Sequence, residues 1–396
     1  MRISTASFQN DAVGQMDALE AALSKTQQQL STGLKVQNAS DNPTGMSTVN
    51  QLNVEISAST QYTTNSNTAQ TNLQLEGQAM SDATNIMQNV NTLSVEANNS
   101  ALTASQRGNI ASELQQDLNQ LVSISNRTDS AGAYLFGGIA STHAPFAQSN
   151  NAVTFNGSTQ VNQVQISENQ SISTGDSGAS AFMNVPTGNG TFVTSASLSN
   201  TGSASISTGQ VTQPSQWVPG NYTVTFTDPS DYTITDNVNG ATVSSGTYTD
   251  GSTIAFNGAQ FTVSGTPASG DTFSIAPAGT TSAFSAIANL IATLQSTSLN
   301  NGQLVTQLGA SIQQVQNTIT SFSNVSASVG SRLNAITASQ TTATTNQTNM
   351  KTNIASITNV DYAAATTALS SEELALQAAQ ESYASLEKMS LFQYLQ

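Results

Sequence analysis

The stretch "VTQLGASIQQVQNTITSFSNVSASVGSRLNAI", residues 305–336, decides how the chain folds. Its apolar residues recur at alternating intervals of three and four, the repeat of a helix that packs along another helix. The stripe continues to Ile357, so we expect one helix over 303–357. At 1.5 Å per residue this helix would be about 80 Å long, so it cannot wrap around a small core. It must therefore lie along other long helices.

Residues 1–136 carry further helical stripes. A seven-residue spacing runs from Met16 to Leu30, and Gly33 is placed to end that helix in a left-handed conformation. Asn42 and Pro43 then have the residue types of an N-cap and a first helical position, so a second helix should begin there. Its stripe continues to a predicted break near Gly108, after which another helix follows.

The middle of the chain, residues 137–282, has a different pattern. Apolar and polar residues alternate in stretches such as "NYTVTFTD" and "STIAFNG", as in strands with one buried face. Asn-Gly or Asp-Gly pairs at 239–240, 250–251 and 257–258 are typical of hairpin turns. We predict an inserted antiparallel β domain, either a sandwich or a small barrel. Whether the region forms one β domain or two remains open, because 185–215 is poor in apolar residues.

The fold class predicted is α+β, with a long antiparallel coiled coil or helical bundle formed by the N- and C-terminal regions. A β insert leaves and re-enters at one place, so the helices on either side of it emerge together. Helices gain most of their stability from burial, and the two outermost segments have no further part of the chain to cover them. We expect these segments to be disordered in the monomer and to be covered by neighbouring molecules.

Five segments follow from this reasoning. They are an N-terminal polymerisation segment (1–40), the first half of a helical rod domain (41–136), the surface-exposed β domain (137–282), the second half of the rod domain (283–359) and a C-terminal polymerisation helix (360–396). The predicted polymerisation interface contains Met16, Leu19, Leu23, Leu30, Leu369, Leu376, Ala379, Tyr383, Leu386, Met389 and Phe392. The predicted rod core contains Met80, Met87, Val90, Leu114, Leu121, Val315, Ile319, Phe322, Val329, Leu333 and Ile336.

Charge excludes some classes of partner. The net charge is −15, from 8 basic and 23 acidic residues, and no Lys or Arg occurs in 137–282. A nucleic-acid surface needs clustered cations, so we expect no nucleic-acid partner. No apolar run approaches the roughly 18 residues that span a bilayer, so we expect no membrane partner. The start "MRISTASFQNDA" lacks the apolar core of a cleavable signal peptide, so any export should use a route without one.

The residues offer little for catalysis, and we expect no enzyme activity, cofactor, metal or small-molecule substrate. Cysteine is absent and His143 is the only histidine, so both nucleophile activation and zinc binding lack their usual groups. Asp228, Asp231 and Asp236 do not have the spacing of a calcium loop and are better explained as turn residues. The stretch "GAYLFGG", residues 132–138, is predicted to be a hydrophobic strand under the β domain.

Three motifs resemble those of bacterial flagellins. "STGLKVQNASDNPTGMS" at 31–47 is similar to the family's signature after its first helix. "GSRLNAI" at 330–336 resembles the matching motif of the C-terminal rod, and 360–395 resembles the C-terminal polymerisation helix. Within this superfamily, "MRIST", "GAYLFGG" and "SLFQYL" are similar to the hook-associated proteins of type 3. The strand pattern of the middle region resembles β-domain repeats of hook-associated proteins.

The resemblance implies a structural role at the hook–filament junction of the flagellum. It implies export through the flagellar type III system, with a cytoplasmic chaperone covering the C-terminal helix beforehand. The implied partners are hook-associated protein type 1, flagellin and other copies of the chain in a ring or helical layer. Two alternatives stay open: a flagellin-type filament subunit, and a secreted adhesin with a helical stalk.

Overall fold

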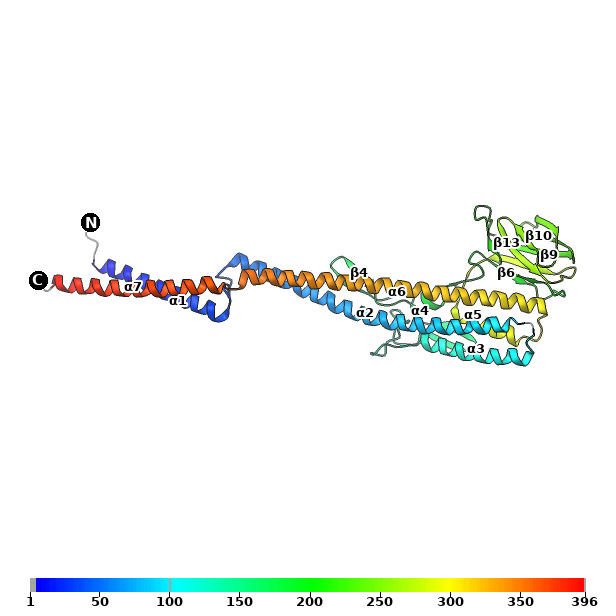
Figure 1. The fold of residues 1–396 in the computed structure, drawn as a ribbon, viewed down its shortest axis with the longest axis horizontal. Coiled ribbons are helices and arrows are strands. Elements are labelled where there is room, and N and C mark those ends of the chain that lie inside the picture. The colour runs from blue at the N-terminus through cyan, green and yellow to red at the C-terminus, as the bar shows by residue number, and fades with distance from the viewer. Residues whose placement is uncertain (1–4, 100, 395–396) are drawn as a thin grey trace. The chain divides into compact units, whose positions relative to one another are not determined.

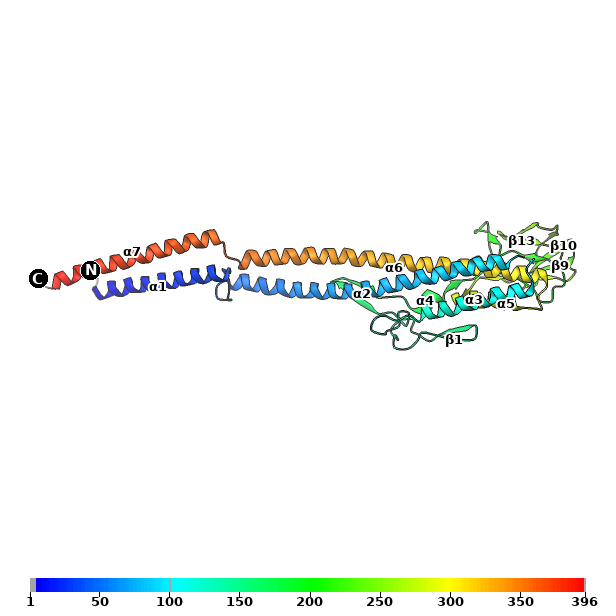
Figure 2. The same ribbon diagram turned by 60° about the horizontal axis from the view of Figure 1, so that its bottom comes forward.

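A computed structural model describes residues 5–99 and 101–394, with side chains described for 7–99 and 101–385. Long helices and an antiparallel β region make up the fold, as predicted (Figures 1 and 2). The chain divides into two compact units. The terminal unit contains 1–63 and 340–396, and the central unit contains 64–339.

The terminal unit is built from paired helices. Helix α1 (Thr5–Thr32) packs along α7 (Tyr362–Tyr394), and the first part of α2 (Pro43–Ala97) and the last part of α6 (Asn301–Thr358) also belong to this unit. The predicted end of the first helix is confirmed, because Gly33 has φ +72°. The predicted start of the second is confirmed too: α2 begins at Pro43, and the Asn42 side chain accepts a hydrogen bond from the Gly45 amide at 2.9 Å.

The segments that connect these helices pair with each other. Residues 33–42 link α1 to α2, and 359–361 link α6 to α7. The Lys35 amide donates to the Thr358 carbonyl at 2.8 Å, and the Val360 amide donates to the Gly33 carbonyl at 2.9 Å. These two backbone hydrogen bonds hold the two helix interruptions at the same level.

The helices of the central unit surround one apolar core. α3 (Ala104–Ser125) and α5 (Ala283–Gln295) pack on each other and share that core with α2 and α6. The predicted helix over 303–357 is confirmed within two residues at its N-terminal end and one at its C-terminal end by α6 (Asn301–Thr358). Its buried apolar side chains recur every seven residues, which is the coiled-coil repeat. They are Leu308, Val315, Phe322, Val329 and Ile336.

The helix break predicted near Gly108 is wrong in position. α2 ends at Ala97, and α3 begins at Ala104 behind a capping box between Thr103 and Gln106. Gly108 lies inside α3, where a glycine is tolerated at a cost of about 1 kcal/mol relative to alanine. The cap therefore decides where the helix starts, and the glycine does not.

Residues 126–186 cover the helices with turns and short hairpins. β1 (Phe146–Ser149) pairs with β2 (Ala152–Phe155), and β3 (Gln163–Ser167) pairs with β4 (Gln170–Ser173). The short helix α4 (Gly178–Phe182) follows, and then β5 (Val185–Pro186), which pairs with β15 (Thr280–Thr281).

The strand predicted at 132–138 is wrong. The segment forms turns with one isolated bridge, between Tyr134 and Thr128. Phe136 is fully buried in the helical core, and it does not pack under the β sandwich.

The remaining strands form a β sandwich, the first of the two predicted architectures. One sheet has the order β11 (Thr242–Thr247), β10 (Asp231–Asp236), β9 (Tyr222–Asp228), β14 (Thr272–Pro277) and β6 (Phe192–Ala196). The other has β12 (Thr253–Phe256), β13 (Ala259–Ser264) and β7 (Ser205–Ile206), with β8 (Gln210–Val211) also paired to β13. Their inner faces share one core, and no sheet closes into a barrel in the described residues (Figure 1).

The three predicted turn pairs behave differently. Asn257 and Gly258 both have positive φ, 45° and 79°, and form the two-residue hairpin between β12 and β13. Gly240 also has positive φ, in a longer connection between β10 and β11. Asp250-Gly251 does not make a hairpin, because it connects strands of different sheets. A turn pair therefore marks a reversal without specifying which strands pair.

Candidate functional site

Helices α1 and α7 carry the predicted polymerisation stripes. Those residues whose side chains are described are half-buried rather than fully buried, because two helices alone cover only one side of each other. They are Met16, Leu19, Leu23, Leu30, Leu369, Leu376, Ala379 and Tyr383. The side chains of Leu386, Met389 and Phe392 lie outside the described residues. The pairing of α1 and α7 is visible in Figure 2.

The same two helices expose apolar side chains that the heptad pattern did not single out. Phe8, Val13, Tyr362 and Leu374 all lie on the outside of the pair, and Leu374 is 68% exposed. Phe8, Val13 and Leu374 lie off the seven-residue stripes, so a search for one helical face does not find them. Tyr362 lies seven residues before Leu369, on the α7 stripe, and is nevertheless exposed.

The predicted rod-core residues differ little in burial. Nine are buried and two, Ile319 and Leu333, are half-buried. The buried residues are Met80, Met87, Val90, Leu114, Leu121, Val315, Phe322, Val329 and Ile336.

The β sandwich is attached to the start of α6 through side-chain amides and hydroxyls. The Gln303 amide donates to the carbonyl oxygens of Ser197 at 3.0 Å and Asn200 at 3.3 Å. The Ile206 amide donates to the Thr306 hydroxyl at 3.1 Å. Gln303 and Thr306 are buried, so these bonds are sheltered from competing water.

We expect Gln303→Ala to weaken this attachment by about 1–3 kcal/mol, because it leaves the carbonyl of half-buried Ser197 without this donor. Hydrogen exchange of the amides in 197–203 should become faster in the variant. Gln316→Ala is the matched control, since that side chain is exposed on the same helix. Equal exchange in the two variants would contradict the prediction.

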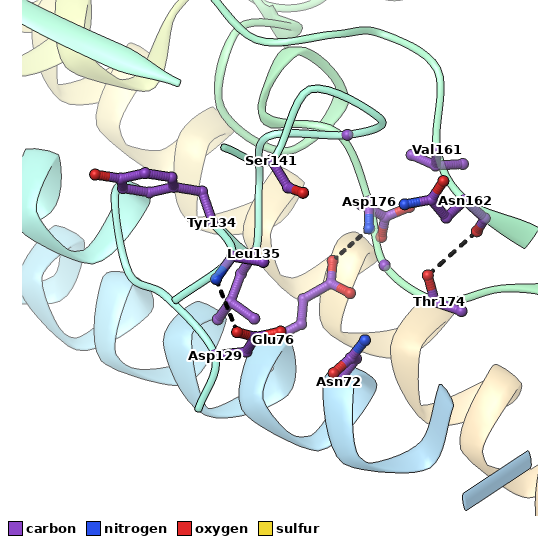
Figure 3. Close-up of a pocket in the computed structure, with 13 residues that line it drawn as sticks. Asn72, Glu76, Asp129, Tyr134, Leu135, Ser141, Val161, Asn162, Thr174 and Asp176 are labelled. Atoms are coloured by element: carbon purple, nitrogen blue, oxygen red, sulfur yellow. Dashed lines mark hydrogen bonds between the residues drawn. The ribbon is translucent and has the colours of Figure 1, made fainter. Parts of the chain in front are cut away.

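A small polar cavity of about 80 Å³ lies where α2 meets the loops around 129–141 and 161–176. Figure 3 shows Glu76 reaching into it from α2. Glu76 is only 1% exposed, and its Oε1 accepts a hydrogen bond from the Asp176 amide at 3.1 Å. The Asp176 carboxylate forms an ion pair with Arg332 of α6. Sequence reasoning missed this cluster, because its members are far apart along the chain.

No catalytic or metal-binding arrangement is found among the described residues. No group of three or more His, Cys, Asp or Glu side chains there could hold a metal ion. His143 is exposed, and its Nδ1 lies 2.9 Å from the Thr142 hydroxyl. Asp228 and Asp236 act as turn residues, as predicted: each accepts a hydrogen bond from the backbone amide two residues later. In the same residues, no helix combines the length and apolar character needed to cross a membrane.

Two family models match the sequence. Residues 3–141 match the model of the bacterial flagellin N-terminal helical region. Residues 195–277, which form most of the β sandwich, match the D2-like domain of flagellar hook-associated protein 1.

Curated relatives and solved structures agree with these matches. The flagellar hook-associated protein 3 of Salmonella typhimurium is 29% identical over 185 residues, which is 47% of this chain and 58% of that protein. The Escherichia coli protein of the same name is 31% identical over 148 residues, 37% of this chain and 47% of that protein. The crystal structure of Xanthomonas campestris FlgL is 33% identical with a TM-score of 0.72, covering 77% of this chain and 99% of that one. The Legionella pneumophila hook-associated protein-3 structure is 28% identical with a TM-score of 0.71, covering 79% and 98%.

Proposed function

The chain belongs to the bacterial flagellin superfamily, in the group of flagellar hook-associated protein 3 (FlgL), and we propose that it is the structural adaptor between the hook and the filament of a flagellum. It acts by assembly rather than by catalysis. Its helical termini join it to neighbouring subunits, and its β sandwich is carried on the outside.

The observation that carries this proposal is the half-buried pair of α1 and α7. The apolar stripes, from Met16 to Leu30 on α1 and from Leu369 to Tyr383 on α7, remain partly open to water in a single copy. Burying apolar area contributes about 25 cal/mol per Å², so contact with neighbouring copies would stabilise these helices substantially.

The balance between apolar burial and conformational entropy also explains why growth would depend on a template. Ordering a disordered residue costs about 1–2 kcal/mol of backbone entropy. If the terminal segments are disordered in the free monomer, as we propose, they gain enough burial only where subunits are already in place. An adaptor of this kind adds to an existing end and does not polymerise freely in solution.

The proposed partners are hook-associated protein type 1 on the hook side, flagellin on the filament side and other copies of this chain within a layer. Before export, a cytoplasmic chaperone covers the C-terminal helix. We propose that export uses the flagellar type III route. The family match of the β sandwich to a hook-associated protein 1 domain supports a common architecture for neighbouring junction layers.

Deletion of the gene tests this function against a flagellin-like role. We expect cells without the protein to keep their hooks, to lack filaments and to release unassembled flagellin into the medium, because the filament has no end on which to start. Electron microscopy of cells shows the hooks and filaments, and electrophoresis of the medium shows the released flagellin. The wild-type gene on a plasmid is the control. Filaments of normal length on the deletion strain would exclude the adaptor function.

A further inference from the structure

The hydrogen-bonding of Glu76 is incomplete. Its Oε1 has one donor, the Asp176 amide, whereas its buried Oε2 has no hydrogen-bond partner among the described residues. In Figure 3 the carboxyl group points into the cavity, between Asp176 and Thr174. A buried carboxylate normally accepts several hydrogen bonds or pairs with a cation, because leaving its charge unpaired is costly.

The only cation facing Glu76 within the described residues is already engaged. Arg332 of α6 pairs with the Asp176 carboxylate. Asp129 lines the same cavity, and its Oδ1 accepts the Ala131 and Ala133 amides. Tyr134 also lines the cavity, but its ring points away from Glu76 in Figure 3. An ionised Glu76 would therefore add a further negative charge to a site with one guanidinium.

Burial and the nearby negative charge of Asp176 raise the pKa of Glu76 to about 8, against the smaller opposing effect of Arg332. Both causes act in the same direction as the missing hydrogen bond, since each favours the neutral acid. A neutral Glu76 carboxyl group needs no cation of its own, so Arg332 can pair with the Asp176 carboxylate alone.

From this geometry we propose that Glu76 holds a proton at neutral pH and forms a proton-dependent joint that ties α2, through Asp176, to α6. With the proton in place, Asp176 bonds Glu76 through its backbone and Arg332 through its side chain. When the proton leaves to solvent through the cavity, two carboxylates compete for one guanidinium and the joint loosens. This inference does not depend on the proposed function.

Loosening of this joint would also disturb the packing of the helical core. The next residue, Ser177, caps α4, and the Gly178 amide donates to the Phe136 carbonyl at 2.8 Å. Phe182 at the end of α4 is buried among aromatic rings of the core. The segment 174–182 therefore connects the titrating group to the packing of the central unit.

The dependence on pH has a definite sign. A carboxyl group whose pKa is higher in the folded protein keeps its proton there while the unfolded chain has lost it. The stability that depends on this proton is fully present below about pH 4.5, falls as the pH rises and levels off above about pH 8. Over that window the unfolding equilibrium constant should increase by up to about tenfold per pH unit from this group.

Glu76→Gln is the direct test, because glutamine keeps the shape of the protonated acid and cannot ionise. Denaturant unfolding of the full chain is measured from about pH 5 to about pH 9, with Glu96→Gln, an exposed residue of the same helix, as the control. We expect the Glu76→Gln variant to gain stability relative to the wild type as the pH rises, and the control to follow the wild type. Parallel curves for all three proteins would overturn the proposal.

A second measurement on the wild-type protein covers the case in which the variant fails to fold. Infrared difference spectroscopy should show a protonated carboxyl band at neutral pH that disappears as the pH passes about 8. Absence of this band at neutral pH would overturn the proposal. So would stabilisation by added Na⁺ or Ca²⁺ that depends on Glu76, since a cation would then neutralise the group in place of a proton.

Discussion

Replacing Phe182 by alanine is expected to lower the free energy of unfolding of the central unit by about 3–5 kcal/mol. Its ring is fully buried and lies against Phe136 at 4.9 Å, Phe322 at 5.3 Å, Phe146 at 5.5 Å and Phe284 at 5.7 Å between ring centroids. These partners come from four separate segments, including α5 and α6. The cavity left by the substitution would therefore remove the contact that all four share.

Denaturant unfolding followed by near-ultraviolet circular dichroism measures this loss, with hydrogen exchange of α5 locating it. Leu198→Ala is the matched control, because that side chain is 73% exposed and its truncation should change stability by less than about 0.5 kcal/mol. Phe182→Leu should fall between the two, since it retains most of the apolar volume. If Phe182→Ala unfolds with the wild-type midpoint, the ring cluster does not hold the helices together.

The second large effect concerns assembly and depends on the proposed function. Leu376→Asp should abolish filament formation almost completely. Leu376 lies half-buried on the α7 stripe, where contact with neighbours would bury it further. A carboxylate buried there without a partner costs several kcal/mol in each copy, and every copy of a layer would carry it. Swimming in soft agar and electron microscopy of a deletion strain expressing the variant make the measurement.

Gln377→Asp is the control for this experiment, because it adds the same charge to the adjacent, exposed position of α7. It should leave filaments and swimming close to normal. Export must be checked as well, by detecting the Leu376→Asp protein in the medium. Normal swimming of an exported Leu376→Asp variant would show that this stripe is not part of the interface.

Local patterns in the sequence are sufficient to predict the long helices and the antiparallel β region. The heptad stripe of 305–336 predicted α6, and the pair Asn42-Pro43 predicted the start of α2, because spacing and capping are properties of neighbouring residues. Alternation predicted an antiparallel β region for the same reason. The flagellin-like motifs predicted the family, and the comparisons confirmed it.

Features that depend on distant residues were missed. Nothing near Glu76 in the sequence indicates that Asp176 and Arg332 will lie beside it. Phe182 follows the small residues of the stretch "GASAF", which gives no sign that four other rings will enclose it. Residues 126–186 were assigned partly to helix and partly to the β domain, although their short hairpins and turns cover the helical core. Tertiary packing determines the positions of these side chains and segments, and the pattern of a single sequence carries no information about that packing.

The paired connections at 33–36 and 358–360 restrict how α1 and α7 can move. Tilting both helices together preserves the bonds from the Lys35 amide to Thr358 and from the Val360 amide to Gly33. Sliding one helix along the other by a single turn, about 5.4 Å, would break both bonds at once. In the proposed assembly, the two helices of a subunit already in place would therefore keep a fixed alignment, and their apolar residues would meet an incoming subunit at constant heights along the pair.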